Sequence, residues 1–214
     1  MGPCAAVPAE VYSGPMDNRP DPHWYVFDYG MVISTAPEDA DWLAMEDAAG
    51  LGLRHSASTY WRHRRDYDEG RLSSVEYWSQ VLGVPVSLGK ADELDSLDAF
   101  QWSHLNLDTL DVLELLSSRS AGLAVLSNMP AAMADEFDGA SWTKYFAQSF
   151  YSSRIGMTKP HPGVFRHVAA ELGAEPSSIV FIDDKAENIA AAAALGFNTV
   201  HHVPGTDLLR ELQL

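Results

Sequence analysis

Residues 178–196 read SIVFIDDKAENIAAAAALG, and this stretch decides the fold class. Its first five residues form a largely apolar run that predicts a buried strand ending at Ile182. Two aspartates follow, and the alanine-rich segment from Glu187 to Leu195 predicts a helix that stops at Gly196. A buried strand joined by a short turn to a helix is the repeating unit of a parallel sheet.

The same unit recurs elsewhere in the chain. Apolar runs predict further strands, and longer apolar or amphipathic segments predict helices between them. The predicted strands are 24–27, 122–126, 148–151 and 198–200, and the predicted helices are 107–118 and 162–173. Alternating strands and helices predict a parallel sheet with helices on both faces, which is an α/β fold.

Residues 36–104 differ from the rest because they lack strand-like alternation. Trp42 and Met45 recur at helical spacing, and Gly50 and Gly83 are typical helix stops. We therefore expect a helical cap of roughly 70 residues, inserted into a core that comprises residues 23–35 and 105–214. Residues 1–22 are rich in Pro, Ala and Gly and are predicted to be a flexible N-terminal tail.

Composition and charge limit the possible partners. Acidic residues outnumber Lys and Arg by 30 to 14, and the formal net charge is -16. Such a surface repels nucleic acid and anionic membranes, and no apolar run approaches the roughly 20 residues that span a bilayer. Because Cys4 is the single cysteine and residues 1–22 do not resemble a secretory signal, we expect a cytoplasmic protein. Nothing in the sequence indicates an oligomeric state.

Three aspartates follow predicted strands, at the edge where a parallel sheet presents side chains to ligands. Asp28 could attack a substrate and form a covalent intermediate, or it could simply cap a turn. Asp183 and Asp184 repel each other unless a cation offsets their charge, so they predict a divalent-metal site. A solvated acidic turn is the alternative interpretation of this pair.

Three further residues could hold an anion. Ser127 and Asn128, after the second strand, could bind a phosphoryl oxygen or cap the next helix. Lys159, which precedes Pro160, could neutralise a phosphate and the nucleophile together, or it could be a solvated surface charge. Because the protein is strongly acidic, a phosphate site needs such a local cation or a metal ion.

In this order the motifs resemble those of the haloacid dehalogenase superfamily, in particular its phosphatases with a small helical cap after the first strand. The resemblance covers about residues 24–214 and implies a Rossmann-like, doubly wound core, Mg²⁺ dependence and an aspartyl-phosphate intermediate. It also implies the role of each motif residue. By this resemblance Asp28 is the nucleophile, Ser127 with Asn128 beside it is the second-motif hydroxyl, and Lys159 is the third-motif lysine. Asp183 and Asp184 form the acidic metal-binding motif, of which Asp184 is the main Mg²⁺ ligand.

One position departs from the family pattern. Family phosphatases usually carry a second aspartate, a general acid and base, two residues after the nucleophile, and here that position is Gly30. The Gly30 carbonyl can still face the metal, but the proton shuttle, typically worth about 10²–10⁴-fold in rate, is missing. We therefore expect a preference for leaving groups that need little protonation, such as anomeric sugar phosphates, unless a histidine substitutes. The histidine candidates are His55, His63, His104 and His161.

The sequence thus predicts a Mg²⁺-dependent hydrolase of phosphomonoesters, in which Asp28 and Lys159 are catalytic. The predicted partner is a small, sugar-phosphate-like metabolite. One of four cap arginines is expected to face the site, and they are Arg62, Arg64, Arg65 and Arg71. Two alternatives remain: a turnover-deficient phosphate-binding or regulatory protein of the same family, and a dehalogenase that attacks carbon without a metal.

Overall fold

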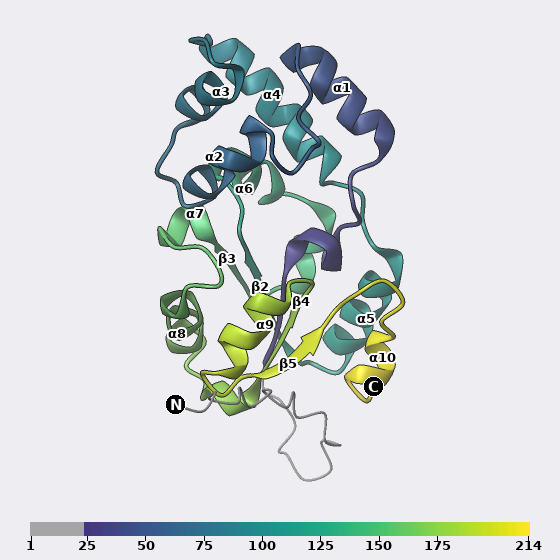
Figure 1. The fold of residues 1–214 in the computed structure, drawn as a ribbon. Helices are drawn as coiled ribbons and strands as arrows, with labels where there is room; N and C mark the ends of the chain where they lie inside the picture. The colour runs from purple at the N-terminus through teal and green to yellow at the C-terminus, as the bar shows by residue number, and fades with distance from the viewer. Residues whose placement is uncertain (1–23) are drawn as a thin grey trace, which may run out of the picture.

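The computed structural model describes residues 24–214, so the predicted tail at residues 1–22 lies outside the described residues. Five parallel strands form one sheet in the order β3-β2-β1-β4-β5 (Figure 1). The strands are β1 (Trp24–Phe27), β2 (Gly122–Ser127), β3 (Gln148–Tyr151), β4 (Ile179–Asp183) and β5 (Asn198–His201). The prediction of an α/β fold with a parallel sheet is confirmed.

The register of the central strand brings the site residues to one edge of the sheet. Phe27 in β1 is aligned with Val125 in β2 and with Ile182 in β4. The chain runs outward from β1 to β3 on one side and then crosses to β4 on the other side, so the winding reverses beside β1. A ligand crevice forms at such a reversal, outside the carboxyl ends of the strands.

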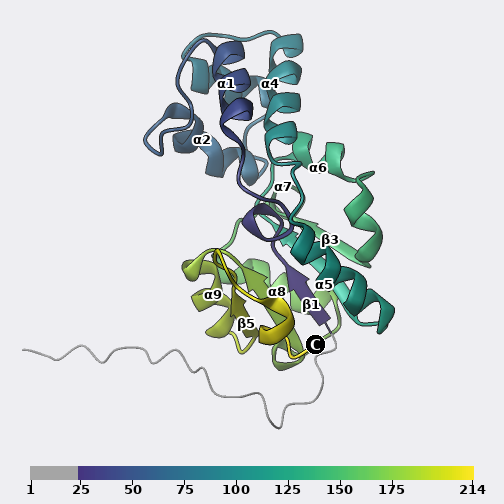
Figure 2. The same ribbon diagram turned by 90° about the vertical axis from the view of Figure 1, so that its right-hand side faces the viewer.

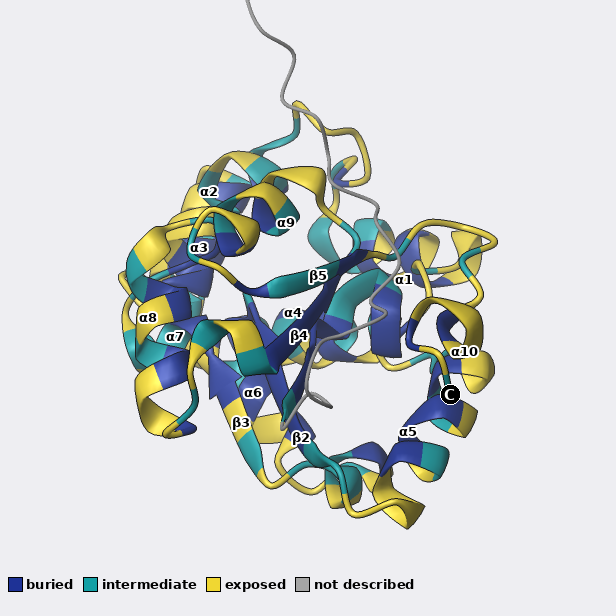
Figure 3. Ribbon diagram, turned by 90° about the horizontal axis from the view of Figure 1, so that it is seen from below, coloured by how far each residue is buried: buried dark blue, intermediate teal, exposed yellow. Residues whose placement is uncertain are grey.

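Helices cover both faces of the sheet, which is therefore buried on both sides (Figures 2 and 3). The helices of this part are α5 (Leu107–Ser118), α6 (Ala131–Phe137), α7 (Ser152–Ile155), α8 (Pro162–Glu171), α9 (Ala186–Ala193) and α10 (Leu208–Glu211), with short turns at η2 (Ser141–Tyr145) and η3 (Pro176–Ser178). Phe27 and Val125 pack on one face with α5, α6 and α10, whereas Val26 and Phe181 pack on the other face with α8 and α9. Burial on both faces explains why the strand sequences are continuous apolar runs.

The segment between β1 and α5 is a helical insertion, as predicted. Its helices share a separate hydrophobic cluster, in which Tyr60, Tyr77 and Trp78 are fully buried. The rings of Tyr67 and Tyr77 stack with centroids 4.1 Å apart. The insertion lies beyond the carboxyl edge of the sheet (Figures 1 and 2). Its helices are α1 (Asp39–Ala49), α2 (Thr59–Asp68), α3 (Ser74–Leu82) and α4 (Leu88–Gln101).

Polar contacts fix the end of α2 to the core. The Ser152 hydroxyl donates to the carbonyl of Asp68, and the Thr158 hydroxyl donates to the Glu69 carboxylate at 2.7 Å. These bonds hold the insertion over the edge where the site residues gather. Among residues 24–214, no helix combines the length and apolar character needed to cross a membrane.

Candidate active site

Asp28 is a buried carboxylate at the end of β1, with one oxygen engaged and one free. Oδ1 accepts a hydrogen bond from the backbone N–H of Tyr29 at 2.7 Å and forms an ion pair with Lys159 Nζ at 2.8 Å. Within the described residues, Oδ2 has no hydrogen-bonding partner. The wide turn η1 (Tyr29–Ile33) directly follows Asp28, and within it Met31 lies in the left-handed region at φ 61°. Asp28 is thus oriented by one oxygen and free to react through the other.

Lys159 is a buried cation with three protein oxygens around its ammonium group. Nζ donates hydrogen bonds to Asp183 Oδ2 at 2.7 Å and to the carbonyl oxygen of Leu126 at 2.8 Å, and it forms an ion pair with Asp28 Oδ1 at 2.8 Å. Burial acts to lower the pKa of Lys159, but the two carboxylates raise it above its ordinary value. Lys159 therefore stays charged.

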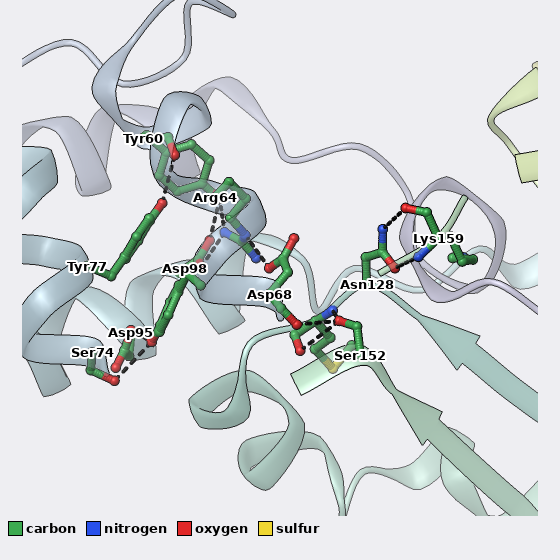
Figure 4. Close-up of polar contacts among 12 residues, drawn as sticks. Tyr60, Arg64, Asp68, Ser74, Tyr77, Asp95, Asp98, Asn128, Ser152 and Lys159 are labelled. Carbon is green, nitrogen blue, oxygen red and sulfur yellow. Dashed lines mark hydrogen bonds and ion pairs between the residues drawn. The ribbon is translucent and has the colours of Figure 1, made fainter. Parts of the chain in front are cut away.

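Asn128 positions Lys159. Its Nδ2 donates to the Lys159 carbonyl at 2.9 Å, and its Oδ1 accepts from the Lys159 backbone N–H at 2.8 Å (Figure 4). The Asn128 amide is therefore already occupied. Ser127, by contrast, is buried at the end of β2 and makes no side-chain hydrogen bond within the described chain, which leaves its hydroxyl available to a ligand.

Three carboxylates converge at the carboxyl edge. One oxygen from each of Asp28, Asp183 and Asp184 lies within 4.8 Å of the other two. Asn188 Nδ2 donates to both oxygens of Asp183 at 2.9 and 3.0 Å, and the Lys185 backbone N–H donates to Oδ1 at 2.8 Å. Among residues 24–214, the buried Asn188 Oδ1 has no hydrogen-bonding partner. Carboxylate and amide oxygens are ligands suited to a hard divalent cation, so this set fits one.

The charges of this cluster do not balance. Burial raises the pKa of Asp28 to about 7, although Lys159 acts to lower it. Burial would also raise the pKa of Asp183, but Lys159 holds it below its ordinary value. Burial and the neighbouring Asp183 raise the pKa of Asp184. One lysine therefore faces three carboxylates, and the excess negative charge favours a bound cation.

A cavity of about 600 Å³ lies between the carboxyl edge and the insertion. Asp28, Ser127, Asn128, Lys159 and Asp184 line it from the core, and Asp183 lies behind them. The insertion contributes the opposite wall, which is made by Trp61, Arg64, Arg65, Asp68 and Trp102.

The arginines expected at the site divide into two pairs. Arg64 and Arg65 line the cavity, whereas Arg62 and Arg71 are not among its lining residues. Lys185 also lines it, so basic side chains gather here although the chain as a whole is strongly acidic. Asp28, Asp68, Asp184 and Glu187 also line the cavity, so the positive charge that an anionic ligand needs depends on these basic groups together with a bound cation.

Gly30 lines the cavity beside Trp102. A Cβ placed on Gly30 would meet the Trp102 ring at 3.7 Å, an ordinary van der Waals distance, so a side chain fits there. None of the four histidine candidates is among the described residues that line the cavity, and His104 is held by Asp41 at 2.9 Å. A histidine at the position of the missing acid therefore has no support.

Two residues of the site have only weak signals in the sequence. Asn188 donates to Asp183, and its signal is its place on the first turn of the helix after the acidic pair. Asp68 was not singled out, and its only signal is the spacing of four residues from Arg64, which is typical of an ion pair on a helix.

Comparison with known proteins assigns the family. The model of the haloacid dehalogenase-like hydrolases matches residues 31–196, and the chain belongs to this family of hydrolases. It is similar to D-ribitol-5-phosphate phosphatase of Bacteroides thetaiotaomicron, with 27% identity over 199 residues that cover 87% of this chain and 95% of the relative. It is also similar to (S)-2-haloacid dehalogenase 1 of a Pseudomonas species, with 27% identity over 190 residues and 82% of each chain covered.

Solved structures show the same fold. A haloacid dehalogenase family enzyme from Bacteroides thetaiotaomicron superposes with a TM-score of 0.73 at 19% identity, covering 90% of this chain and 98% of that chain. Structures of that enzyme contain magnesium alone or magnesium with inorganic phosphate. A dehalogenase with a bound intermediate superposes less closely, with a TM-score of 0.55 at 18% identity and 87% of each chain covered. Magnesium is thus bound by structural relatives, and the present chain contains a buried acidic triad.

Proposed function

We propose that this protein is a Mg²⁺-dependent phosphatase that hydrolyses phosphomonoesters of small, sugar-phosphate-like metabolites through an aspartyl-phosphate at Asp28. One observation carries the proposal. Asp28 Oδ2 is free beside a ligand cavity, its other oxygen is held by Lys159, and the oxygens of Asp183 and Asp184 lie within 4.8 Å. A buried, oriented carboxylate next to a cation site suits in-line attack on phosphorus.

The chain's own residues account for the covalent steps. Asp28 Oδ2 forms a bond to phosphorus while the bond from phosphorus to the leaving oxygen breaks, and water then hydrolyses the acyl phosphate. Lys159 stabilises the added negative charge through its positive charge, which lies 2.8 Å from Asp28 Oδ1. We assign phosphate binding to the Ser127 hydroxyl, to the segment at Asn128 and to the charge of Lys159.

The proposed Mg²⁺ ligands are Asp28, the Gly30 carbonyl, Asp183 and Asp184. Asp184 is the most accessible of the three carboxylates, since Asp183 is engaged by Asn188 and Lys159. When bound, the ion would neutralise part of the phosphoryl charge and favour the ionised form of Asp28.

The cavity supports a small, hydroxylated substrate. Its wall combines aromatic rings with charged groups, and the similar D-ribitol-5-phosphate phosphatase acts, by its name, on a polyol phosphate. We propose that residues 36–104 act as a cap that covers the reacting groups and excludes bulk water. Action on such a metabolite agrees with the predicted cytoplasmic location.

Phosphate release tests this function. The purified protein is assayed with p-nitrophenyl phosphate, D-ribitol 5-phosphate and a set of sugar phosphates, with and without Mg²⁺, beside Asp28→Asn as the control. We expect release that requires both Mg²⁺ and Asp28. Metal-independent halide release from a 2-haloacid would instead identify a dehalogenase. Phosphate binding without turnover would identify a regulatory protein, the alternative that Gly30 favours.

A further inference from the structure

A second buried cation lies between two carboxylates in the insertion. Arg64 Nε is 2.7 Å from Asp68 Oδ1, and Arg64 Nη1 is 2.7 Å from Asp98 Oδ2 (Figure 4). We call these three residues the cap ion cluster. Tyr60 and Gln101 donate to Asp98 Oδ1 at 2.7 and 2.9 Å, so both oxygens of Asp98 are occupied.

Asp68 differs from Asp98 because one of its oxygens is unused. Oδ1 accepts from Arg64, and within the described residues Oδ2 has no protein partner. Asp68 lines the same cavity as Asp28 and Gly30, whereas Asp98 does not line it. A buried carboxylate with a free oxygen therefore faces the proposed reaction site.

The position of Asp68 is fixed by the core. The Ser152 hydroxyl donates to the Asp68 carbonyl and accepts from the backbone N–H of Met129 at 2.9 Å. Met129 directly follows Asn128, which holds Lys159. In Figure 4 Asp68 lies between Arg64 and Asp98 on one side and Asn128 on the other. Two hydrogen bonds of Ser152 and the peptide bond between Asn128 and Met129 thus connect the Asp68 backbone to the segment that holds Lys159.

We propose that Asp68 Oδ2 performs the proton transfers for which Gly30 has no side chain. This inference rests on the proposed phosphatase function. In the first step the bond from phosphorus to the leaving oxygen breaks, and protonated Asp68 gives its proton to that oxygen, which departs as an alcohol. In the second step Asp68 takes a proton from the water that attacks the acyl phosphate, so that inorganic phosphate and the Asp28 carboxylate form and Asp68 is protonated again.

The surroundings of Asp68 suit both roles. Burial raises the pKa of Asp68, Arg64 on the same helix lowers it, Asp98 from α4 raises it, and Lys185 from the core lowers it. The result is a pKa above the ordinary value for an aspartate, so the protonated form persists to a higher pH than in an exposed aspartate.

The test compares Asp68→Asn with Asp98→Asn on two substrates. p-Nitrophenyl phosphate has a leaving group that departs without a proton, whereas the alkoxide of D-ribitol 5-phosphate needs one. For Asp68→Asn we expect kcat/KM, which reports phosphoryl transfer to Asp28, to fall by about 10²–10⁴-fold on the alkyl phosphate and by less than about tenfold on the aryl phosphate. The value of kcat should fall on both substrates, because water attack on their common acyl phosphate also loses its base. Asp98→Asn disturbs the same arginine without facing the cavity, so it should not produce this difference between substrates.

A rescue and a pH profile separate proton transfer from a purely structural role. Gly30→Asp added to Asp68→Asn should restore turnover of the alkyl phosphate, because position 30 has room for a side chain. The alkaline limb of kcat/KM against pH on the alkyl phosphate should be absent in Asp68→Asn. Equal losses of kcat/KM on both substrates, or the same pattern in Asp98→Asn, would overturn the proposal.

If Asp68→Asn does not fold, the unmodified protein provides a second test. With a proton donor present, kcat/KM falls only gently as the pKa of the leaving alcohol rises across a series of aryl and alkyl phosphates. A steep fall would overturn the role of Asp68 and would support the leaving-group preference predicted from Gly30. Failure to release phosphate from any member of the series would overturn the phosphatase function itself.

Discussion

The core and the insertion each hold a buried cation between carboxylates, but they use different residues. In the core, Lys159 lies between Asp28 and Asp183, a set that we call the core ion cluster. In the insertion, Arg64 lies between Asp68 and Asp98. Each cluster buries one cation between two carboxylates, of which one faces the cavity and the other lies behind it.

The difference between the clusters is a third carboxylate. Asp184 adds negative charge to the core ion cluster, and Asn188 adds an unpartnered oxygen, so the core can accept a cation. In the cap ion cluster, Asp98 is instead fully hydrogen-bonded and Asp68 keeps one free oxygen. An excess of negative charge thus favours metal binding in the core, whereas a single free carboxylate oxygen favours exchange of a proton in the cap.

The largest expected effect comes from removing the nucleophile. Asp28→Asn keeps the size of the side chain and an acceptor for Lys159 but removes the attacking carboxylate. We expect phosphatase activity to fall on the order of 10⁴-fold or more with every substrate, as for other essential catalytic groups. Steady-state rates with aryl and alkyl phosphates measure this, and retention of activity on either would contradict a nucleophilic Asp28.

Removing either central cation should cost similar stability. Lys159→Met and Arg64→Met each leave two buried carboxylates without their partner, and breaking a buried pair in this way typically costs about 3–5 kcal/mol. Urea unfolding measures the loss. Lys185→Met is the control, because Lys185 lines the cavity and forms no ion pair within the part of the chain that the structure describes. A loss below about 1 kcal/mol for either variant would mean that its cluster is not rigidly paired.

Magnesium should distinguish the two clusters. At a concentration about 100 times its dissociation constant, Mg²⁺ should stabilise the unmodified protein by about 2.7 kcal/mol through binding to the folded state alone. We expect the same gain for Asp68→Asn and little gain for Asp184→Asn. Thermal unfolding with and without Mg²⁺ shows this, and an equal gain for both variants would place the ion elsewhere.

The smallest expected effect is at Gly30. Its φ of -62° is accessible to any residue, and a Cβ would lie 3.7 Å from Trp102. Gly30→Ala should therefore change the free energy of unfolding by about 0.5 kcal/mol or less. Urea unfolding measures this free energy. A larger loss of stability would mean that the loop cannot hold a side chain at position 30, and the Gly30→Asp rescue would then have to be attempted at another position.

Much of the fold and the core half of the site could be predicted from the sequence. Continuous apolar runs specify strands buried on both faces, and parallel pairing places the residues after them at one edge. For this reason Asp28, Ser127 and Asp183 could be grouped before any contact was known. The observed order β3-β2-β1-β4-β5 places them beside the reversal of the winding. The role of each residue in that group stays a prediction.

The cap half of the site was decided by tertiary structure. Asp68 lies 40 residues from Asp28 and 91 from Lys159 in the sequence, and no periodic pattern relates them. Its direction depends on how α2 packs on α3 and α4 and on the hydrogen bond from Ser152. Likewise, only packing determined that three protein oxygens surround Lys159 Nζ. The apolar run of a buried strand is a local pattern that a sequence records directly, whereas the way in which two separately packed hydrophobic clusters face each other depends on all their side chains at once.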